Sequence, residues 1–170
     1  MSAWRQARAI ALLPGTVTVL IPVLLVVLTD AVVGWGGDGL AVLPVLLGLA
    51  AIAAGLALWL WTVRLFARIG RGTLAPWDPT RHLVVEGPYR HVRNPMITAV
   101  VTVLAGEAAL FGSLPLLIWC LAFLAVNHLF FVIHEEPGLV RRFGDEYRAY
   151  RDNVPRWLPR RTAWTPPQPR

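Results

Sequence analysis

The sequence contains no lysine and has little charge of either sign. All 16 basic residues are arginine, ten residues are acidic, and charged residues make up only 15% of the 170. Hydrophobic residues make up 56%. A soluble globular domain carries roughly 25% charged residues. The shortage of charge therefore excludes an ordinary soluble domain and predicts a protein that lies in lipid.

Cysteine and metal-binding motifs are also scarce. Cys120 is the single cysteine, so neither an internal disulfide nor a thiolate metal cluster can form within the chain. The four histidines show no HxxxH or HExxH spacing; they are His82, His91, His128 and His134. We therefore expect no metal site.

Long hydrophobic runs are what the sequence does contain. There are four, at 10–33, 40–63, 96–111 and 114–133. About 20 apolar residues cross a hydrocarbon core, so the first two runs suffice, the fourth nearly does and the third is short. The first run lacks a cleavage pattern, and we expect it to be retained, with kinks at Pro14 and Pro22. The runs predict an all-α integral membrane protein with about four transmembrane helices, the last two forming a hairpin around 111–113.

The arginines are distributed very unevenly along the chain. They lie in the amino-terminal tip, between 64 and 93, and from 141 onward, whereas the connections at 34–39 and 112–113 have none. Arginine on short connections marks the cytoplasmic side. We therefore expect a multi-pass protein of the cell membrane with both termini in the cytoplasm. This topology and contact with anionic membrane lipids explain the net charge of +6 without a nucleic-acid partner.

The chain divides into three parts at 1–66, 67–160 and 161–170. The first is a two-helix membrane region, and the last, rich in proline, is expected to be disordered. The middle part holds a long loop, the hairpin and a tail with apolar residues near helical spacing. These apolar residues are Leu139, Val140, Phe143, Tyr147, Tyr150 and Val154. Their pattern predicts an amphipathic helix that lies on the cytoplasmic surface.

The stretch GPYRHVRNPM at 87–96 places polar side chains directly before the third hydrophobic run. Its two prolines leave backbone groups free to face a cavity at membrane depth. Its charged side chains either anchor the helix end or bind a small zwitterion. A glycine pattern, GRG at 70–72, lies on the same arginine-rich side and is a secondary candidate for ligand binding.

Glu135 and Glu136 lie at the other end of the hairpin, where Pro137 is expected to end the fourth helix. Carboxylates at the membrane border are costly unless they are paired or in use. Helical spacing places Glu135 on a face with His128. These carboxylates either form a border anchor, with Glu135 paired to an arginine, or bind a ligand.

Together these motifs resemble the membrane-embedded isoprenylcysteine carboxyl methyltransferases and the related phospholipid N-methyltransferases. The resemblance covers about 70–160 and includes the tail FGDEYRAYRDNVPRWLPR. In that family a short motif opens the hairpin and a glutamate pair closes it, enclosing S-adenosylmethionine at the cytoplasmic side. The matching positions here are Arg93, Asn94, Pro95, Glu135 and Glu136. Ile97 replaces the usual tyrosine, and Asn94 replaces the histidine of the isoprenylcysteine branch.

The resemblance implies that 67–160 is the catalytic region of an S-adenosylmethionine-dependent methyltransferase. Arg93 would bind the carboxylate of the cofactor, and the glutamates its ammonium and hydroxyl groups. Further expected cofactor contacts are Gly70, Gly72, Tyr89, His91, Asn94, Pro95 and His134. The expected catalytic residues are Arg93, Glu136 and Arg156. Arg156 would orient an anionic substrate group or contact a lipid headgroup.

The methyl acceptor is expected to be lipophilic and to enter from the bilayer. It is either the carboxylate of a compound like a prenylated cysteine or a lipid amine, with a thiol as a further option. A carboxylate needs no general base, whereas an amine must lose a proton, which His91 or Glu136 could take. The competing hypothesis is a non-catalytic membrane protein that binds heme or another ligand through Asn127, His128 and His134.

Overall fold

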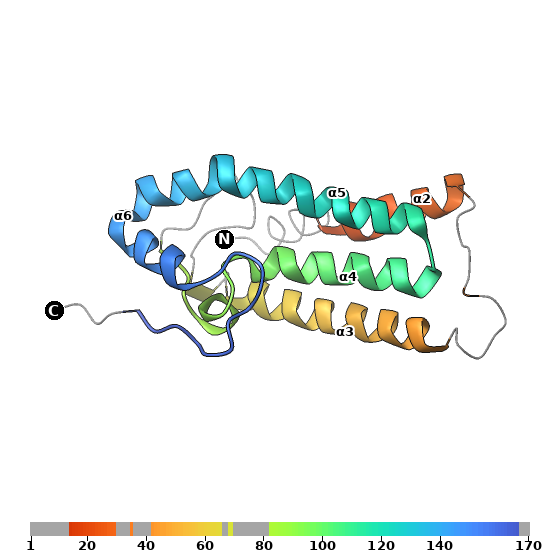
Figure 1. The fold of residues 1–170 in the computed structure, drawn as a ribbon, viewed down its shortest axis with the longest axis horizontal. Helices are drawn as coiled ribbons and strands as arrows, with labels where there is room; N and C mark the ends of the chain where they lie inside the picture. Colours follow the sequence, from red (N-terminus) through yellow and green to blue (C-terminus); the bar gives the residue numbers. More distant parts are fainter. Residues whose placement is uncertain (1–13, 30–34, 36–41, 66–67, 70–81, 167–170) are drawn as a thin grey trace.

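The computed structural model describes residues 14–29, 35, 42–65, 68–69 and 82–166 (Figure 1). The elements are η1 (Thr16–Leu20), α2 (Ile21–Thr29), α3 (Val42–Leu65), η4 (Gly87–Arg90), α4 (Pro95–Phe111), α5 (Leu114–Phe130), η5 (Phe131–Glu135) and α6 (Glu136–Asn153). The described residues contain no β-strand. The predicted all-helical class is confirmed.

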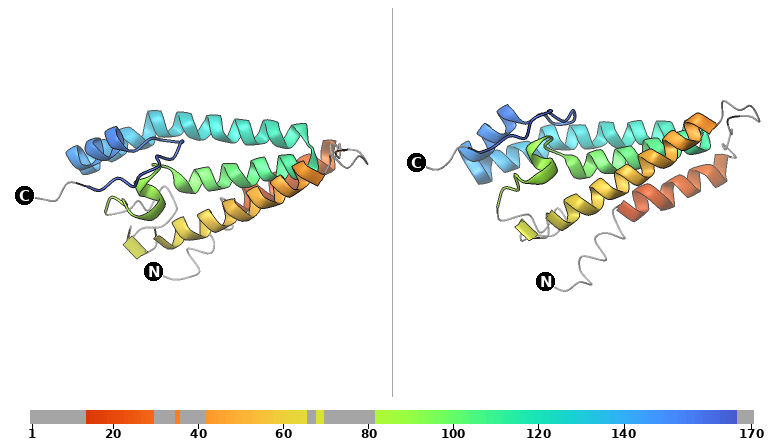
Figure 2. Two further views of the ribbon diagram at one scale, coloured as in Figure 1. Left: turned by 60° about the horizontal axis from the view of Figure 1, so that its bottom comes forward. Right: turned by 90° about the horizontal axis from the view of Figure 1, so that it is seen from below.

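The long helices run side by side, and the chain reverses between them. α3 lies antiparallel to α4, and α5 returns beside α4, so the start of α4 and the end of α5 lie at the same end of the molecule (Figures 1 and 2). Two helices are long and apolar enough to cross a membrane: Val42–Leu65 and the continuous helix Leu114–Asn153. Thr16–Thr29 and Pro95–Phe111 are apolar but shorter.

Small residues let α3 and α4 approach until their backbones touch. A Cβ added to Gly48 would lie 2.8 Å from the carbonyl oxygen of Gly106, and one added to Gly106 would lie 2.8 Å from that of Gly48. Gly55 meets the carbonyl oxygen of Ala99 in the same way. Close packing through small residues is the main means by which helices associate in lipid. It holds α4, and hence the loop before it, in place.

The hairpin between α4 and α5 is confirmed at the expected position. Gly112 has a left-handed backbone (φ 59°), and its N–H donates to the carbonyls of Ala108 and Ala109. The Ser113 N–H donates to the Ala108 carbonyl oxygen at 3.1 Å. Such bonds satisfy the last carbonyls of a helix and reverse the chain within two residues. α5 therefore leads back to the end where α4 began.

The helix after the hairpin does not end before Pro137, which is a correction to the sequence-based expectation. α5 continues through the π-helical segment η5 into α6. The Glu136 N–H donates to the Phe131 carbonyl, five residues earlier. A proline ring clashes with the carbonyl four residues before it, and the wider π turn relieves that clash.

Pro22 is accommodated by the same device near the start of the chain. The π-helical segment η1 comes directly before α2, and the Ile21 N–H donates to the Thr16 carbonyl. The helix therefore continues past Pro22, with the local irregularity that the sequence predicts for this proline.

The sequence predicts that the helix α6 lies on the cytoplasmic surface; in the structure its apolar face packs against other parts of the protein. Tyr147, Tyr150 and Val154 are buried together, and they pack against Leu83 of the loop and Trp164 of the tail. Gly144, with φ 54°, kinks α6, so its second half turns back over the loop (Figure 1). Trp164 packs here although 161–170 was expected to be disordered; positions 167–170 lie outside the described residues.

Candidate functional site

The loop before α4 holds Arg93 at the mouth of the hairpin. η4 forms one 3-10 turn, in which the His91 N–H donates to the Pro88 carbonyl oxygen at 3.0 Å. Pro95 then opens α4, where a missing N–H costs no helical hydrogen bond. Both the N–H and the hydroxyl of Thr98 donate to the Asn94 carbonyl oxygen. Asn94 and Pro95 thus shape the helix start, and Arg93 lies directly before it.

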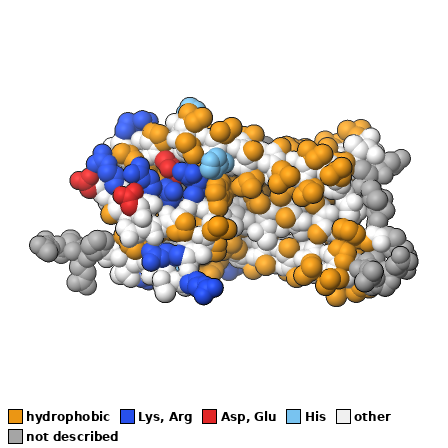
Figure 3. Space-filling view, in the orientation of Figure 1, with side chains coloured by type: hydrophobic (Ala, Val, Ile, Leu, Met, Phe, Trp, Pro, Cys, Tyr) orange, Lys and Arg blue, Asp and Glu red, His pale blue; other side chains and the backbone are white. Residues whose placement is uncertain are grey.

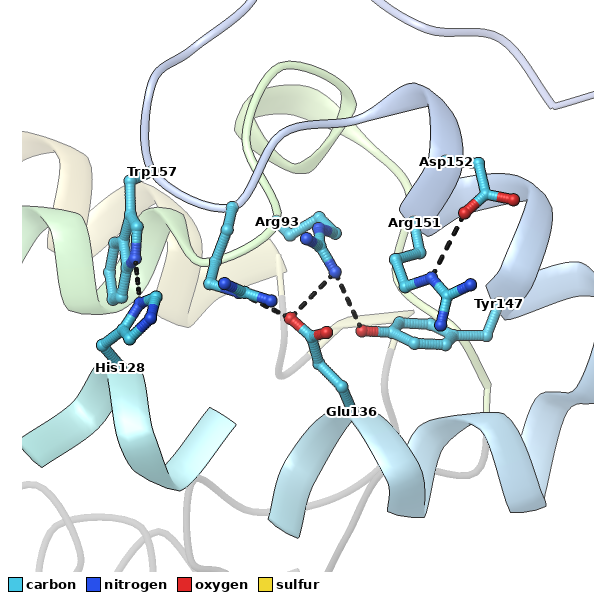
Figure 4. Close-up of polar contacts among 8 residues, drawn as sticks. Arg93, His128, Glu136, Tyr147, Arg151, Asp152 and Trp157 are labelled. Atoms are coloured by element: carbon cyan, nitrogen blue, oxygen red, sulfur yellow. Dashed lines mark hydrogen bonds and ion pairs between the residues drawn. The ribbon is translucent and has the colours of Figure 1, made fainter. Parts of the chain in front are cut away.

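Two arginines converge on the carboxylate of Glu136 (Figure 4). Arg93 donates through Nη1 to Glu136 Oε1 at 2.9 Å, and Arg156 donates through Nε to the same oxygen at 2.7 Å. Arg93 Nη1 also lies 3.4 Å from the Tyr147 hydroxyl. The side chains of Arg93 and Glu136 are only 10% and 14% exposed. We call these four residues the Arg93 cluster.

The Arg93 cluster carries more positive than negative charge. Two guanidinium groups share one carboxylate, and the hydrogen bond and charge of Glu136 raise the pKa of Arg156 above its ordinary value. The Nε of Arg93 is buried and has no partner among the described residues. A buried donor without a partner is costly. The cluster therefore suits an additional anionic group, such as a carboxylate or phosphate.

Glu135 behaves differently from its neighbour. The structure gives its carboxylate no hydrogen bond or ion pair within the described residues, so the expected pairing with an arginine falls to Glu136 instead. Burial raises the pKa of the Tyr89 hydroxyl, and the nearby charge of Glu135 raises it further. Tyr89 therefore stays neutral, and the Glu135 carboxyl group is left without a partner among the described residues, available to a ligand.

His91 fastens the carboxy-terminal segment to the loop. Its Nδ1 lies 2.9 Å from the Arg160 carbonyl oxygen, and because a carbonyl only accepts, Nδ1 carries the proton. The Arg160 N–H donates back to the His91 carbonyl at 3.0 Å. The Arg93 N–H donates to the Pro155 carbonyl oxygen, and the Trp164 N–H donates to the Arg90 carbonyl oxygen. The segment 155–164 thus covers the loop that carries Arg93.

His134, a further residue proposed from the sequence, makes no described contact with the Arg93 cluster. His134 is exposed on the helix, and its ring lies 5.7 Å from that of Phe130. Gly70 and Gly72 lie outside the described residues. Sequence reasoning had missed Tyr147 as a site residue, because it lies on the apolar face of α6. The feature of the sequence that could have indicated this role is the hydroxyl group of Tyr147.

An apolar groove lies between α4 and α5. It has a volume of about 630 Å³, and its lining is Thr98, Val101, Leu121, Leu124, Ala125, His128, Leu129 and Trp157. At its polar end the Trp157 Nε1 donates to His128 Nδ1 at 3.0 Å (Figure 4). Trp157 follows Arg156 in the chain, so the groove borders the Arg93 cluster. Sequence reasoning did not foresee this contact.

Comparison with known protein families shows the family to which the chain belongs. A family model described as phospholipid methyltransferase matches residues 43–146. The chain belongs to the phospholipid methyltransferase family. The expected resemblance is therefore confirmed, and the match includes α3, α4, α5, Arg93 and Glu136. No curated protein and no solved structure matches the chain.

Membership of this methyltransferase family bears on both the Arg93 cluster and the apolar groove. The family implies methyl transfer to lipid-like substrates. The Arg93 cluster is polar, the groove is apolar, and the two lie at adjoining positions. The family does not favour the heme-binding alternative, and the described residues include no group of three side chains suited to hold a metal ion.

Proposed function

We propose that this phospholipid methyltransferase family member transfers the methyl group of S-adenosylmethionine to a lipophilic acceptor at the cytoplasmic face of the membrane. One observation carries the proposal. Arg93 and Glu136, which lie 43 residues apart, meet at the mouth of the hairpin, next to the apolar groove. Charged groups at this depth are costly unless they have a use.

The side chains present fit the chemical groups of the cofactor. Its carboxylate matches the guanidinium groups of Arg93 and Arg156, and the unpartnered Arg93 Nε is one donor available to it. Its ammonium or ribose hydroxyls match the carboxylate of Glu135. When bound, S-adenosylmethionine supplies an electrophilic methyl group on a sulfonium.

The protein contributes mainly alignment and charge. Methyl transfer is an in-line displacement, so the acceptor atom must be held in line with the methyl group. Arg156 connects Glu136 to the groove through the adjacent Trp157 and is placed to hold an anionic group of the acceptor. For an amine acceptor, Glu135 suits the proton better than Glu136, because Glu136 already accepts from two guanidinium groups.

The proposed topology has four membrane spans with both termini in the cytoplasm. Charged side chains gather at one end of the molecule, and hydrophobic side chains cover much of the rest (Figure 3). Reporter fusions at Arg170 and within 36–39 are expected to lie on opposite sides of the membrane. If both reporters lie on the same side, the four-span topology is wrong.

Transfer of a labelled methyl group tests the proposed function and also identifies the acceptor. The purified protein, given S-adenosylmethionine with a radioactive methyl group and an extract of native lipids, is expected to label a lipid-soluble product. The variant Arg93→Met should label at least tenfold less, because a charge-assisted hydrogen bond contributes roughly 1.5–3 kcal/mol. Arg148→Met, which changes an exposed arginine on α6, is the matched control. If wild-type protein labels neither lipids nor prenylated cysteine compounds, the proposal is refuted.

A further inference from the structure

The groove between α4 and α5 has one side-chain donor left among its described residues. Its polar lining residues are Thr98, His128 and Trp157. The Thr98 hydroxyl donates to the Asn94 carbonyl oxygen at 2.9 Å, and the Trp157 Nε1 donates to His128 Nδ1. An indole N–H can only donate, so His128 Nδ1 accepts, and the neutral ring carries its proton on Nε2. That Nε2–H has no partner within the described residues.

The groove opens toward the bilayer. Leu121 and Leu129 line it and are more than half exposed, at 56% and 57%. The remaining wall is apolar apart from the three residues at its polar end. A hydrocarbon chain can therefore enter sideways from lipid without crossing a polar surface. If the chain carries an acceptor such as an ester carbonyl, the side-chain donor left for it among the described groove residues is His128.

The distance from His128 to the Arg93 cluster matches a lipid headgroup. Glu136 follows His128 by eight residues on one continuous helix, which corresponds to a rise of roughly 12 Å. The extended headgroup of a glycerophospholipid spans a comparable length from its ester carbonyl to its terminal amine. A carbonyl held at His128 would thus place the phosphate and amine beside Arg156 and the two glutamates.

We propose that the groove binds one acyl chain of a glycerophospholipid, whose ester carbonyl accepts a hydrogen bond from His128 Nε2. Trp157 acts through His128 as a positioning residue, because its indole fixes the tautomer that donates. The assignment of this lipid as the methyl acceptor rests on the proposed function. The binding of the chain and carbonyl does not, so it is tested without S-adenosylmethionine.

Photolabelling tests where the chain lies. The full-length protein is placed in phosphatidylcholine nanodiscs with a phosphatidylethanolamine that carries a diazirine in one acyl chain, and the cross-linked peptides are identified by mass spectrometry. We expect labelling to concentrate on Leu121 and Leu124. Ala125→Phe fills the groove and should reduce this labelling at least fivefold. Val126→Phe is the matched control, since Val126 is the next residue, is 64% exposed and lies outside the groove lining.

Binding of S-adenosylhomocysteine is measured for the same two variants to show that they are folded. Equal labelling of Ala125→Phe and Val126→Phe would overturn the groove assignment, as would labelling spread evenly over the exposed leucines. If the variants label as expected but the wild-type protein binds no S-adenosylhomocysteine, the groove proposal stands and the proposed function falls.

An ether-linked version of the probe, which has no ester carbonyl, tests the role of His128. We expect the wild-type protein to prefer the ester probe by about fivefold, the effect of one hydrogen bond. His128→Phe should abolish the preference, and Trp157→Phe should reduce it. His128→Gln, which keeps a donor, should restore part of it. An ester preference that persists in His128→Phe would show that the carbonyl is not held there.

Discussion

Replacing Glu136 with glutamine is expected to lower the affinity for S-adenosylhomocysteine by about tenfold to a hundredfold, because Arg93 and Arg156 would no longer be held where each can make a charge-assisted hydrogen bond to the cofactor. The change leaves Arg93 and Arg156 without the carboxylate that both now contact. Because Arg93 is largely buried, the melting temperature should fall as well. Calorimetric titration and thermal unfolding in detergent measure the two effects.

The matched control is Glu146→Gln, which changes an exposed glutamate on the same helix. It should alter neither the affinity nor the melting temperature. If Glu136→Gln lowers the melting temperature but leaves the affinity unchanged, Glu136 has only a structural role, and its assignment to the cofactor site is wrong.

Truncation after Asn153 is expected to abolish measurable binding of S-adenosylhomocysteine while the membrane helices stay inserted. It removes Arg156 from the Arg93 cluster and the Pro155 carbonyl that accepts from the Arg93 N–H. It also removes Trp164 from the buried face of α6 and the Arg160 carbonyl that His91 contacts. Each loss loosens the loop that holds Arg93, so the combined effect should exceed that of any single substitution.

Truncation after Pro166 is the control for this deletion, because every contact of the described tail is kept. The affinity of this shorter protein should equal that of the full chain. Normal binding after truncation at Asn153 would show that the carboxy-terminal segment is not part of the site.

The meeting of Arg93 with the glutamate pair could be predicted from the sequence, because a membrane hairpin must return the chain to the face where it began. Which of the two glutamates pairs with Arg93 could not be predicted. The sequence placed Glu135 on the face of His128 by regular helical spacing. The π-helical segment η5 inserts part of an extra turn and brings Glu136 to that face instead. The sequence shows that the helix must accommodate Pro137, but whether it ends there or forms a π-helical turn depends on packing.

The role of α6 could be predicted only in part, for a similar reason. Its apolar pattern predicted an amphipathic helix, which α6 is. What covers the apolar face depends on the kink at Gly144, which turns the chain back over the loop and brings Trp164 against Tyr150. The contact between His128 and Trp157, 29 residues apart, follows from the same reversal. Local patterns do not specify such reversals.

The most direct test of the account is the affinity of the variant Glu135→Gln for S-adenosylhomocysteine, measured by calorimetry beside the wild-type protein. Glu135 has no hydrogen bond or ion pair within the described residues, so a purely structural reading predicts no change in either affinity or melting temperature. We expect the wild-type protein to bind, and Glu135→Gln to bind about tenfold or more weakly, as for one lost charge-assisted contact, with an unchanged melting temperature. Equal affinities would contradict the claim that Glu135 and the Arg93 cluster bind one zwitterionic cofactor.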